Sequence, residues 1–198
     1  MQCRGFFMKI GFALGNGKSR LHIDPAQLRT HGLVGGCNRI YEEHHVDILV
    51  ATDRKMAAEI EQSGYARNNE MWTRRPIPDH GARELKRPEY GFSSGPALVE
   101  MMFQKGLKEI YLIGFDMGSP NEFVNNIYAG TAWYKTPSQS ATFYGNWVNQ
   151  FKQISEMRGN RKIIRVIGPE STPITWDRTN IVDIDMYSFQ KQFQNKDK

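Results

Sequence analysis

Cysteine is scarce in this sequence, and long apolar runs are absent. The 198 residues include two cysteines, Cys3 and Cys37, and no C-x-x-C motif. A disulfide framework and a structural zinc site are therefore not expected, and a reducing, cytoplasmic location is predicted. No apolar run is long enough to predict a transmembrane helix. Residues 1–9 lack the apolar core and cleavage site of a secretion signal, so none is predicted.

The sequence also lacks a strong excess of either charge. The 26 Lys and Arg residues exceed the 21 Asp and Glu residues by 5, and these charges are spread along the chain. This excess is too small and too scattered to indicate nucleic-acid binding, but it suits a small anionic ligand such as a nucleotide or sugar phosphate. Hydrophobic residues at 39% and charged residues at 24% exclude a disordered chain.

What the sequence does contain is an alternation of strand and helix patterns. Apolar runs predict strands at 8–14, 33–37, 47–52, 110–115 and 162–167. Caps and apolar stripes predict helices that begin at Asp24-Pro25 and that span 53–62, 96–105 and 141–157. Because helices separate the strands, we predict a single Rossmann-like α/β domain over residues 1–189, with a mainly parallel sheet covered by helices on both faces.

Three stretches show no core periodicity. Residues 65–92 are rich in Arg, Asn and Pro, and residues 118–138 are rich in aromatic residues and Asn. Both are predicted to be long loops, and the first is a candidate lid. Residues 190–198 are predicted to form a polar tail.

Ligands of parallel α/β sheets bind beyond the carboxyl ends of the strands. The predicted strand ends there carry Gly15-Asn16-Gly17, Asn38, Thr52-Asp53 and Asp116. The helix start at Ser93-Ser94-Gly95 adds free N–H groups for an anion. We expect these segments to converge on one cleft.

The sequence does not complete several familiar nucleotide-binding and metal-binding motifs. Phe12 stands where a Walker phosphate loop needs glycine, and Arg20 occupies the third glycine position of the dinucleotide fingerprint. The acids of Asp183-Ile184-Asp185 are interpreted as solvated groups near a helix start. The adjacent His44 and His45 would point in different directions. No metal site is predicted.

Taken in order, the remaining motifs resemble those of the bacterial sialyltransferases that modify lipooligosaccharide, within a wider Rossmann-like group that includes pterin diphosphokinase-like enzymes. The resemblance is carried by Gly15-Asn16-Gly17-Lys18-Ser19, Cys37-Asn38-Arg39-Ile40-Tyr41, Ser94-Gly95, the 106–116 strand segment, Tyr128 and Pro169-Glu170-Ser171.

The resemblance implies a metal-independent glycosyltransferase that takes a nucleotide-sugar donor of the CMP-sialic acid type and a glycan acceptor. It implies that Tyr128 donates to the donor phosphate and assists its departure. The residues expected at the nucleotide are Gly15, Asn16, Gly17, Ser19, Asn38, Thr52, Asp53, Ser93, Ser94 and Gly95.

The sequence departs from that family at three positions. The family's catalytic histidine has no counterpart, because residues 136–140 read Thr-Pro-Ser-Gln-Ser. A general base is therefore expected at His80 or Asp116, which join Tyr128 as the candidate catalytic residues. Gly118 replaces a second phosphate-binding tyrosine, and a nucleotide-binding asparagine is replaced at Thr52 or Asp53.

Two other functions fit the same residues. One is a nucleotide-binding protein without transfer activity. The other is a magnesium-dependent diphosphokinase-like transferase in which Asp53 and Asp116 hold Mg²⁺. No cofactor is expected outside this last case, and a homo-oligomer is compatible with the sequence.

Overall fold

The sheet is the centre of the structure. The computed structural model describes residues 9–194. All eight strands are parallel, in the order β5-β4-β3-β2-β1-β6-β7-β8. They span β1 (Ile10–Leu14), β2 (Leu33–Cys37), β3 (Ile48–Ala51), β4 (Met71–Thr73), β5 (Arg83–Glu84), β6 (Glu109–Ile113), β7 (Lys162–Ile167) and β8 (Ile181–Asp185).

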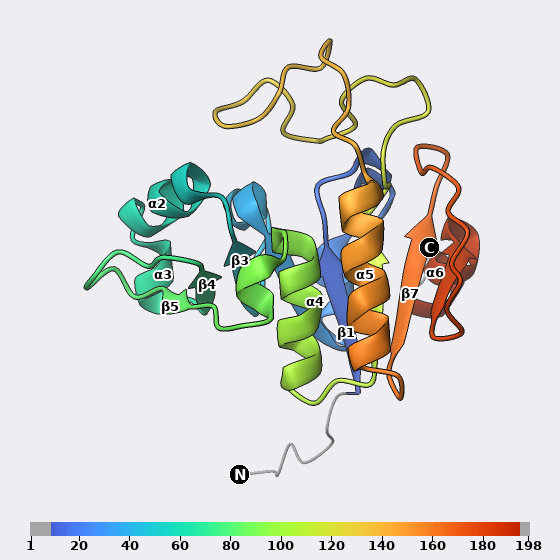
Figure 1. Ribbon diagram of the computed structural model, residues 1–198, viewed down its shortest axis with the longest axis horizontal. Helices are drawn as coiled ribbons and strands as arrows, with labels where there is room; N and C mark the ends of the chain where they lie inside the picture. The colour runs from blue at the N-terminus through green and yellow to red at the C-terminus, as the bar shows by residue number, and fades with distance from the viewer. Residues whose placement is uncertain (1–8, 195–198) are drawn as a thin grey trace.

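Helices cover both faces of the sheet, as predicted. The α-helices are α1 (Pro25–Leu28), α2 (Arg54–Gln62), α3 (Tyr65–Asn68), α4 (Ser94–Gln104), α5 (Gly145–Met157) and α6 (Met186–Phe193). Short 3-10 turns are η1 (Lys18–His22), η2 (Asn38–Glu42) and η3 (Glu89–Gly91). Helices α4 and α5 lie side by side on one face (Figure 1), while α2 and α6 pack on the other.

Alternation along the central strand produces the two cores. Phe12 belongs to the core cluster that contains the buried α2 and α6 residues, whereas the next residue, Ala13, belongs to the cluster that contains the buried α4 and α5 residues. Both side chains have no exposed surface. Successive side chains of a strand point to opposite faces, so a strand buried on both sides reads as a continuous apolar run. This is why the central strands could be recognised in the sequence.

The strand order reverses between β1 and β6. From β1 the chain adds β2 to β5 on one side, and α4 then leads back to β6 on the other side. Leu14 pairs with Ile113, and the Gly15 amide donates to the Ile113 carbonyl at 2.7 Å. The turns that follow these two strands therefore diverge from neighbouring points at the carboxyl edge, the usual ligand position of open α/β sheets.

Several helix ends follow the predicted capping. The Asp24 side chain accepts from the Ala26 amide at 2.9 Å, as predicted. Asp53, predicted to be the first helical residue, instead caps α2 by accepting from the Lys55 and Met56 amides. Gly64 has a φ of 83° just after α2. Glycine tolerates this left-handed conformation, so it is a suitable residue after a helix end.

The structure corrects the predicted boundaries in four places. Residues 65–92 are not a bare loop, because they hold α3, β4, β5 and η3. The 162–167 strand is not the last one, since β8 and α6 follow it. The tail predicted from Gln190 begins later, because α6 continues to the buried Phe193. Helix α5 begins at Gly145 rather than at 141, where the Ala141 amide instead donates to the Glu122 carbonyl.

Two sequence expectations concern the ends and the thiols. The region examined for a secretion signal lies outside the described residues apart from Lys9, and so does Cys3. Cys37 is a free, buried thiol. Between residues 9 and 194, none of the helices combines the length and the apolar character needed to cross a membrane.

Candidate functional site

A cavity of about 390 Å³ lies at the carboxyl edge of the sheet, at the reversal of strand order. Its walls come from the turns after β1, β2, β3 and β6, the start of α4, and α5. The long β6–α5 connection (residues 114–144) rises above this edge in Figure 1 and completes the lining. Nine of the predicted site residues line it: Gly15, Asn16, Gly17, Asn38, Thr52, Ser93, Ser94, Gly95 and Asp116.

The Gly15-Asn16-Gly17 turn packs directly against the end of β6. The Gly17 amide donates to the Gly114 carbonyl at 2.8 Å. A Cβ atom on Gly15 would lie 2.5 Å from the Gly114 carbonyl oxygen, and one on Gly17 would lie 2.4 Å from Asp116 Oδ2. Both contacts are too short for any side chain, so the turn requires glycine on either side of Asn16.

Asn16 presents an unused acceptor in this cavity. Its Nδ2 donates to the Tyr134 hydroxyl at 3.1 Å, and its Oδ1 is buried without a partner among residues 9–194. Burying an unpaired acceptor is costly, so a ligand hydroxyl or amine that donated to Oδ1 would recover a hydrogen bond. Since the Tyr134 hydroxyl accepts from Asn16, its own proton remains free for an acceptor.

The Ser94 hydroxyl links the start of α4 to the segments that follow β2 and β3. It donates to Asn38 Oδ1 at 3.1 Å and accepts from the Thr52 amide at 3.0 Å. The Thr52 hydroxyl, also 3.0 Å away, must then act as the donor to Ser94, because the single Ser94 proton is already used. This network engages Asn38 Oδ1, so Nδ2 is the part of the side chain that can donate to a ligand.

The first turn of α4 offers an anion site. The Ser94 and Gly95 amides have no intrahelical partner, Pro96 has no amide hydrogen, and the Ser93 side chain makes no cap. A Cβ on Gly95 would lie 2.5 Å from Phe115 Cε1, so glycine also lets the aromatic ring pack against the helix start. Free amides and the helix dipole together favour a phosphate here.

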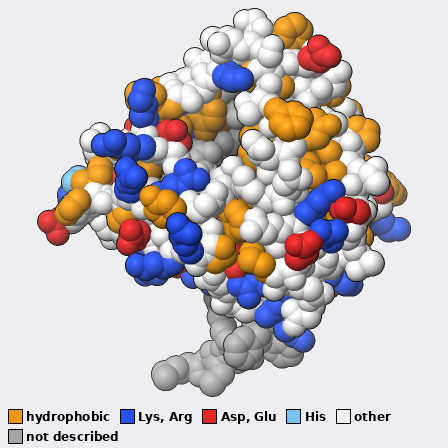
Figure 2. Space-filling model, in the orientation of Figure 1, with side chains coloured by type: hydrophobic (Ala, Val, Ile, Leu, Met, Phe, Trp, Pro, Cys, Tyr) orange, Lys and Arg blue, Asp and Glu red, His pale blue; other side chains and the backbone are white. Residues whose placement is uncertain are grey.

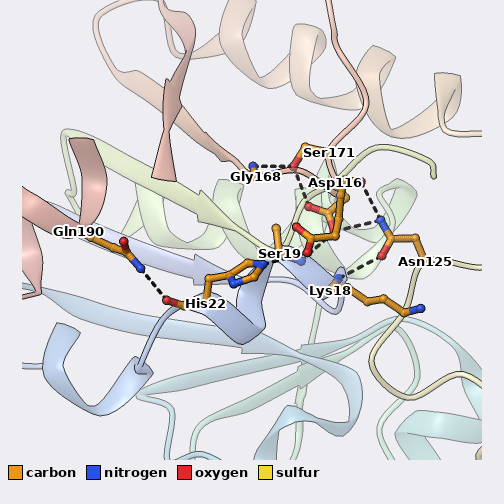
Figure 3. A network of polar contacts seen from close by, with 9 residues as sticks. Lys18, Ser19, His22, Asp116, Asn125, Gly168, Ser171 and Gln190 are labelled. Carbon is orange, nitrogen blue, oxygen red and sulfur yellow. Dashed lines mark hydrogen bonds and ion pairs between the residues drawn. The ribbon is translucent and has the colours of Figure 1, made fainter. Parts of the chain in front are cut away.

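Asp116 holds three segments together beside this cavity. Its carboxylate accepts from the Ser19 amide at 3.1 Å, Asn125 Nδ2 at 3.1 Å and the Ser171 hydroxyl at 2.9 Å. Figure 3 shows these groups pointing toward the carboxylate from the β1 turn, the β6–α5 connection and the segment after β7. Asn125 Oδ1 also accepts from the Lys18 amide, which ties the same segments a second time.

Tyr128 is placed behind the lining rather than in it. It is buried, and its hydroxyl accepts from the Arg20 guanidinium at 3.0 Å. Arg20 is also buried and donates to the Gly15 carbonyl at 3.2 Å. The ring of Tyr134 packs against Tyr128 with centroids 5.7 Å apart and does reach the lining. Burial raises the pKa of the Tyr134 hydroxyl, so it stays protonated and able to donate at neutral pH.

The other predicted site residues lie outside this cavity. Ser19 is fully buried and contributes its amide to Asp116. His80 lies between β4 and β5, where its Nδ1 is 2.9 Å from the Pro78 carbonyl. Asp53 caps α2. Asp53 and Asp116 therefore do not line the same cavity, and residues 9–194 contain no group of three His, Cys, Asp or Glu side chains suited to a metal ion.

The sequence offers the aromatic residues of the β6–α5 connection, Trp133 and Tyr134 among them, as candidates to line a sugar or base pocket, but it does not predict Lys135 there. Trp133, Tyr134 and Lys135 line the cavity, and the Trp133 indole donates to Glu59 of α2. Lys55 lies over the Trp133 ring, 5.0 Å from its centroid. The cluster of aromatic residues in this stretch was the available signal, but nothing in its spacing indicates which of them reach the cavity.

We expect Cys37, which lines the cavity, to resist alkylation in the native protein. Burial raises the pKa of its thiol to about 12, while an unfolded cysteine has a pKa of about 8.5. At pH 8 the reactive thiolate should therefore be on the order of 10³-fold scarcer in the folded state. Iodoacetamide labelling of a Cys3→Ser variant, followed by mass spectrometry with and without urea, measures this difference. Equal rates in both conditions would contradict it.

Comparison with known proteins places this geometry in context. No protein-family model matches the sequence, and no curated protein matches it. Among solved structures, the sialyltransferase CstII from Campylobacter jejuni in complex with the substrate analogue cytidine-5'-monophosphate is 16% identical, with a TM-score of 0.52 over 96% of this chain and 98% of that one. The monofunctional α-2,3-sialyltransferase Cst-I from the same organism is 13% identical, with a TM-score of 0.57 over 93% of both chains.

A further structure of CST-II, in complex with a trisaccharide acceptor and CMP, is 14% identical, with a TM-score of 0.50 over 93% of this chain and 98% of that one. These comparisons show that the chain shares the α/β fold of these sialyltransferases over nearly its whole length. The predicted α/β fold with a parallel sheet is thereby confirmed.

Proposed function

We propose that this protein is a glycosyltransferase that binds a cytidine-monophosphate sugar donor in the cavity between β1 and β6. The observation that carries the proposal is the convergence of Asn16, Asn38 and the α4 N-terminus on one cavity at the reversal of strand order. Solved proteins of the same fold bind CMP or a trisaccharide acceptor. A volume of about 390 Å³ lies within the usual range for small-ligand sites.

The lining provides donors for a nucleotide phosphate. In this proposal the Ser94 and Gly95 amides bind the phosphate, and the free Tyr134 O–H donates to the same group. Lys135 adds a positive charge at the lining. When the bond between the sugar's anomeric carbon and the phosphate oxygen breaks, CMP leaves with that electron pair. Fixed N–H and O–H donors stabilise the developing charge, and they do so without a metal ion.

We assign the general base to Asp116. It lines the cavity, whereas His80, the other residue predicted for this role, does not. A carboxylate has about four lone-pair sites, and protein donors occupy three of those of Asp116. The remaining site takes the proton of the acceptor hydroxyl as its oxygen bonds to the anomeric carbon.

CMP binding is the first test of the proposal. We expect CMP at a hundred times its Kd to stabilise the protein by about 2.7 kcal/mol, with no change when EDTA is present. Thermal or urea unfolding with CMP, UMP and AMP measures the effect and its base preference. The absence of stabilisation by any of the three nucleotides would contradict the proposal.

The Asn38→Gly variant tests the cavity itself. Asn38 has a φ of 58°, so glycine accommodates the backbone while removing the amide side chain. We expect CMP to bind about tenfold more weakly, because a hydrogen bond from Asn38 is lost and Ser94 loses its acceptor. Asp79→Gly, at an exposed loop position with a φ of 65°, is the matched control and should bind CMP normally.

Turnover separates this function from its main alternative. The lining has no histidine, an observation that favours a nucleotide-binding protein without transfer activity. Release of CMP from CMP-sialic acid, measured with and without an acceptor glycan, decides between the two. Binding of CMP without any release of CMP from the donor would establish the alternative.

A further inference from the structure

A groove of about 450 Å³ adjoins the cavity that we propose to bind the sugar donor, which is called the donor cavity below. The two share Thr52, and the segment 90–93 contributes Tyr90 and Gly91 to the groove and Ser93 to the cavity. Three arginines enter the groove lining: Arg54, Arg74 and Arg75. Figure 2 shows Lys and Arg side chains gathered over the part of the surface that α2, β4 and β5 form in Figure 1.

Arg74 is held in place by the backbone. Its Nε donates to the Tyr90 carbonyl and one Nη to the Phe92 carbonyl, both at 2.8 Å, and the other Nη donates to the Thr52 carbonyl at 3.4 Å. A guanidinium has five N–H donors, so two remain. The carbonyl bonds fix the plane of the group without neutralising its charge.

No carboxylate pairs with these arginines. Within residues 9–194, Arg54, Arg74 and Arg75 take part in no ion pair. Asp53 is the acidic residue of the groove, and its Oδ1 already accepts from two amides of α2. Three guanidinium groups thus face one carboxylate in the groove, an excess of positive charge beside the donor cavity.

We infer that this groove binds an anionic group, a phosphate or a carboxylate, carried by the acceptor glycan. The inference rests on the proposed transferase function, because the shared wall puts an acceptor in the groove next to the donor. Arginine suits either anion, since its planar fork can donate two parallel N–H bonds to a pair of oxygens. The rigid Arg74 supplies that fork, while the exposed Arg54 and Arg75 add charge around it.

Three hexoses that differ only at C6 test the inference. Glucose, glucose 6-phosphate and glucuronate are titrated by NMR, with and without saturating CMP, while the Arg side-chain Nε–H signals are followed. We expect the two anions to bind about tenfold or more tightly than glucose and to shift the Arg74 signal. Whichever anion binds more tightly identifies phosphate or carboxylate as the natural group.

The Arg54→Gln/Arg75→Gln variant should weaken this anion preference, because it removes two of the three positive charges and leaves the Arg74 fork. It should still fold, because both side chains are exposed and take part in no ion pair among the described residues. Arg67→Gln, an exposed arginine outside the groove, is the control and should keep the preference. Equal binding of the three hexoses, or the same loss in the control, would overturn the inference. A failure of CMP to bind would instead overturn the proposed transferase, whatever the anions do.

Discussion

Replacement of Asp116 by alanine is expected to destabilise the protein by about 3 kcal/mol or more and to abolish CMP binding. The carboxylate is buried and accepts from Ser19, Asn125 and Ser171. Alanine leaves three donors from three segments without an acceptor, and hydrogen bonds to a charged group contribute about 1.5–3 kcal/mol each, although not additively. Urea unfolding measures the loss of stability, and isothermal calorimetry at low temperature measures CMP binding.

Asp116→Asn separates the positioning role of this residue from its proposed chemistry. An asparagine can direct its Oδ1 toward Ser19 and Asn125 and its Nδ2 toward the Ser171 hydroxyl, which can accept. We therefore expect the variant to fold and to bind CMP, but to transfer sugar about 10²–10⁴-fold more slowly, because an amide cannot act as a base. Unimpaired transfer would remove Asp116 as the base, and loss of CMP binding would show that the amide cannot hold the three segments.

The sequence predicted the parts of the fold that rest on short-range rules. Buried strands such as Ile48–Ala51 are continuous apolar runs, and the Asp24 cap follows from a side chain two residues from the amide that it binds. Strands β4 and β5 have only three and two residues, so no periodicity could mark them. In β8, Asp183 and Asp185 interrupt the apolar pattern, and the same acids made the strand read as a solvated D-x-D segment.

The candidate site divides in the same way. Its backbone parts, the glycine turn around Asn16 and the amides at Ser94 and Gly95, follow from local sequence and from the parallel sheet. Its aromatic part does not. Tyr128 and Tyr134 are six residues apart in a connection without periodicity. Tertiary contacts alone place Tyr134 in the cavity lining and Tyr128 behind that lining. The sequence marks the buried Arg20, which supports Tyr128, only as a departure from the dinucleotide fingerprint.

The second large effect is expected in β7, next to the edge strand β8, where Arg165 is fully buried. Its guanidinium makes two bonds to the Asp183 carboxylate, at 2.8 and 3.1 Å, and a third to the Thr172 carbonyl at 2.9 Å. Arg165→Met should destabilise the protein by about 3–5 kcal/mol, because Asp183 then keeps a charge without its partner. Urea unfolding provides the measurement.

Two further variants identify the cause of that loss. Arg165→Met/Asp183→Asn removes both charges and keeps an acceptor for the Trp176 indole, which donates to Asp183 at 2.7 Å. It should be more stable than Arg165→Met alone, since no unpaired charge remains. Arg29→Met, which breaks the partly exposed pair with Asp47, should cost about 1 kcal/mol or less. If the double variant were no more stable than the single one, packing rather than charge would explain the effect.

Hydrogen bonds connect the Arg165–Asp183 pair to Asp116 in the donor cavity. Arg165 holds the Thr172 carbonyl, the Thr172 amide donates to the Asp116 carbonyl at 2.8 Å, and the neighbouring Ser171 binds the Asp116 carboxylate. An Arg165 variant should therefore weaken CMP binding as well as stability. The double variant, in which the guanidinium is still missing, should recover stability but not CMP affinity. Recovery of both would mean that the segment after β7 is positioned without Arg165.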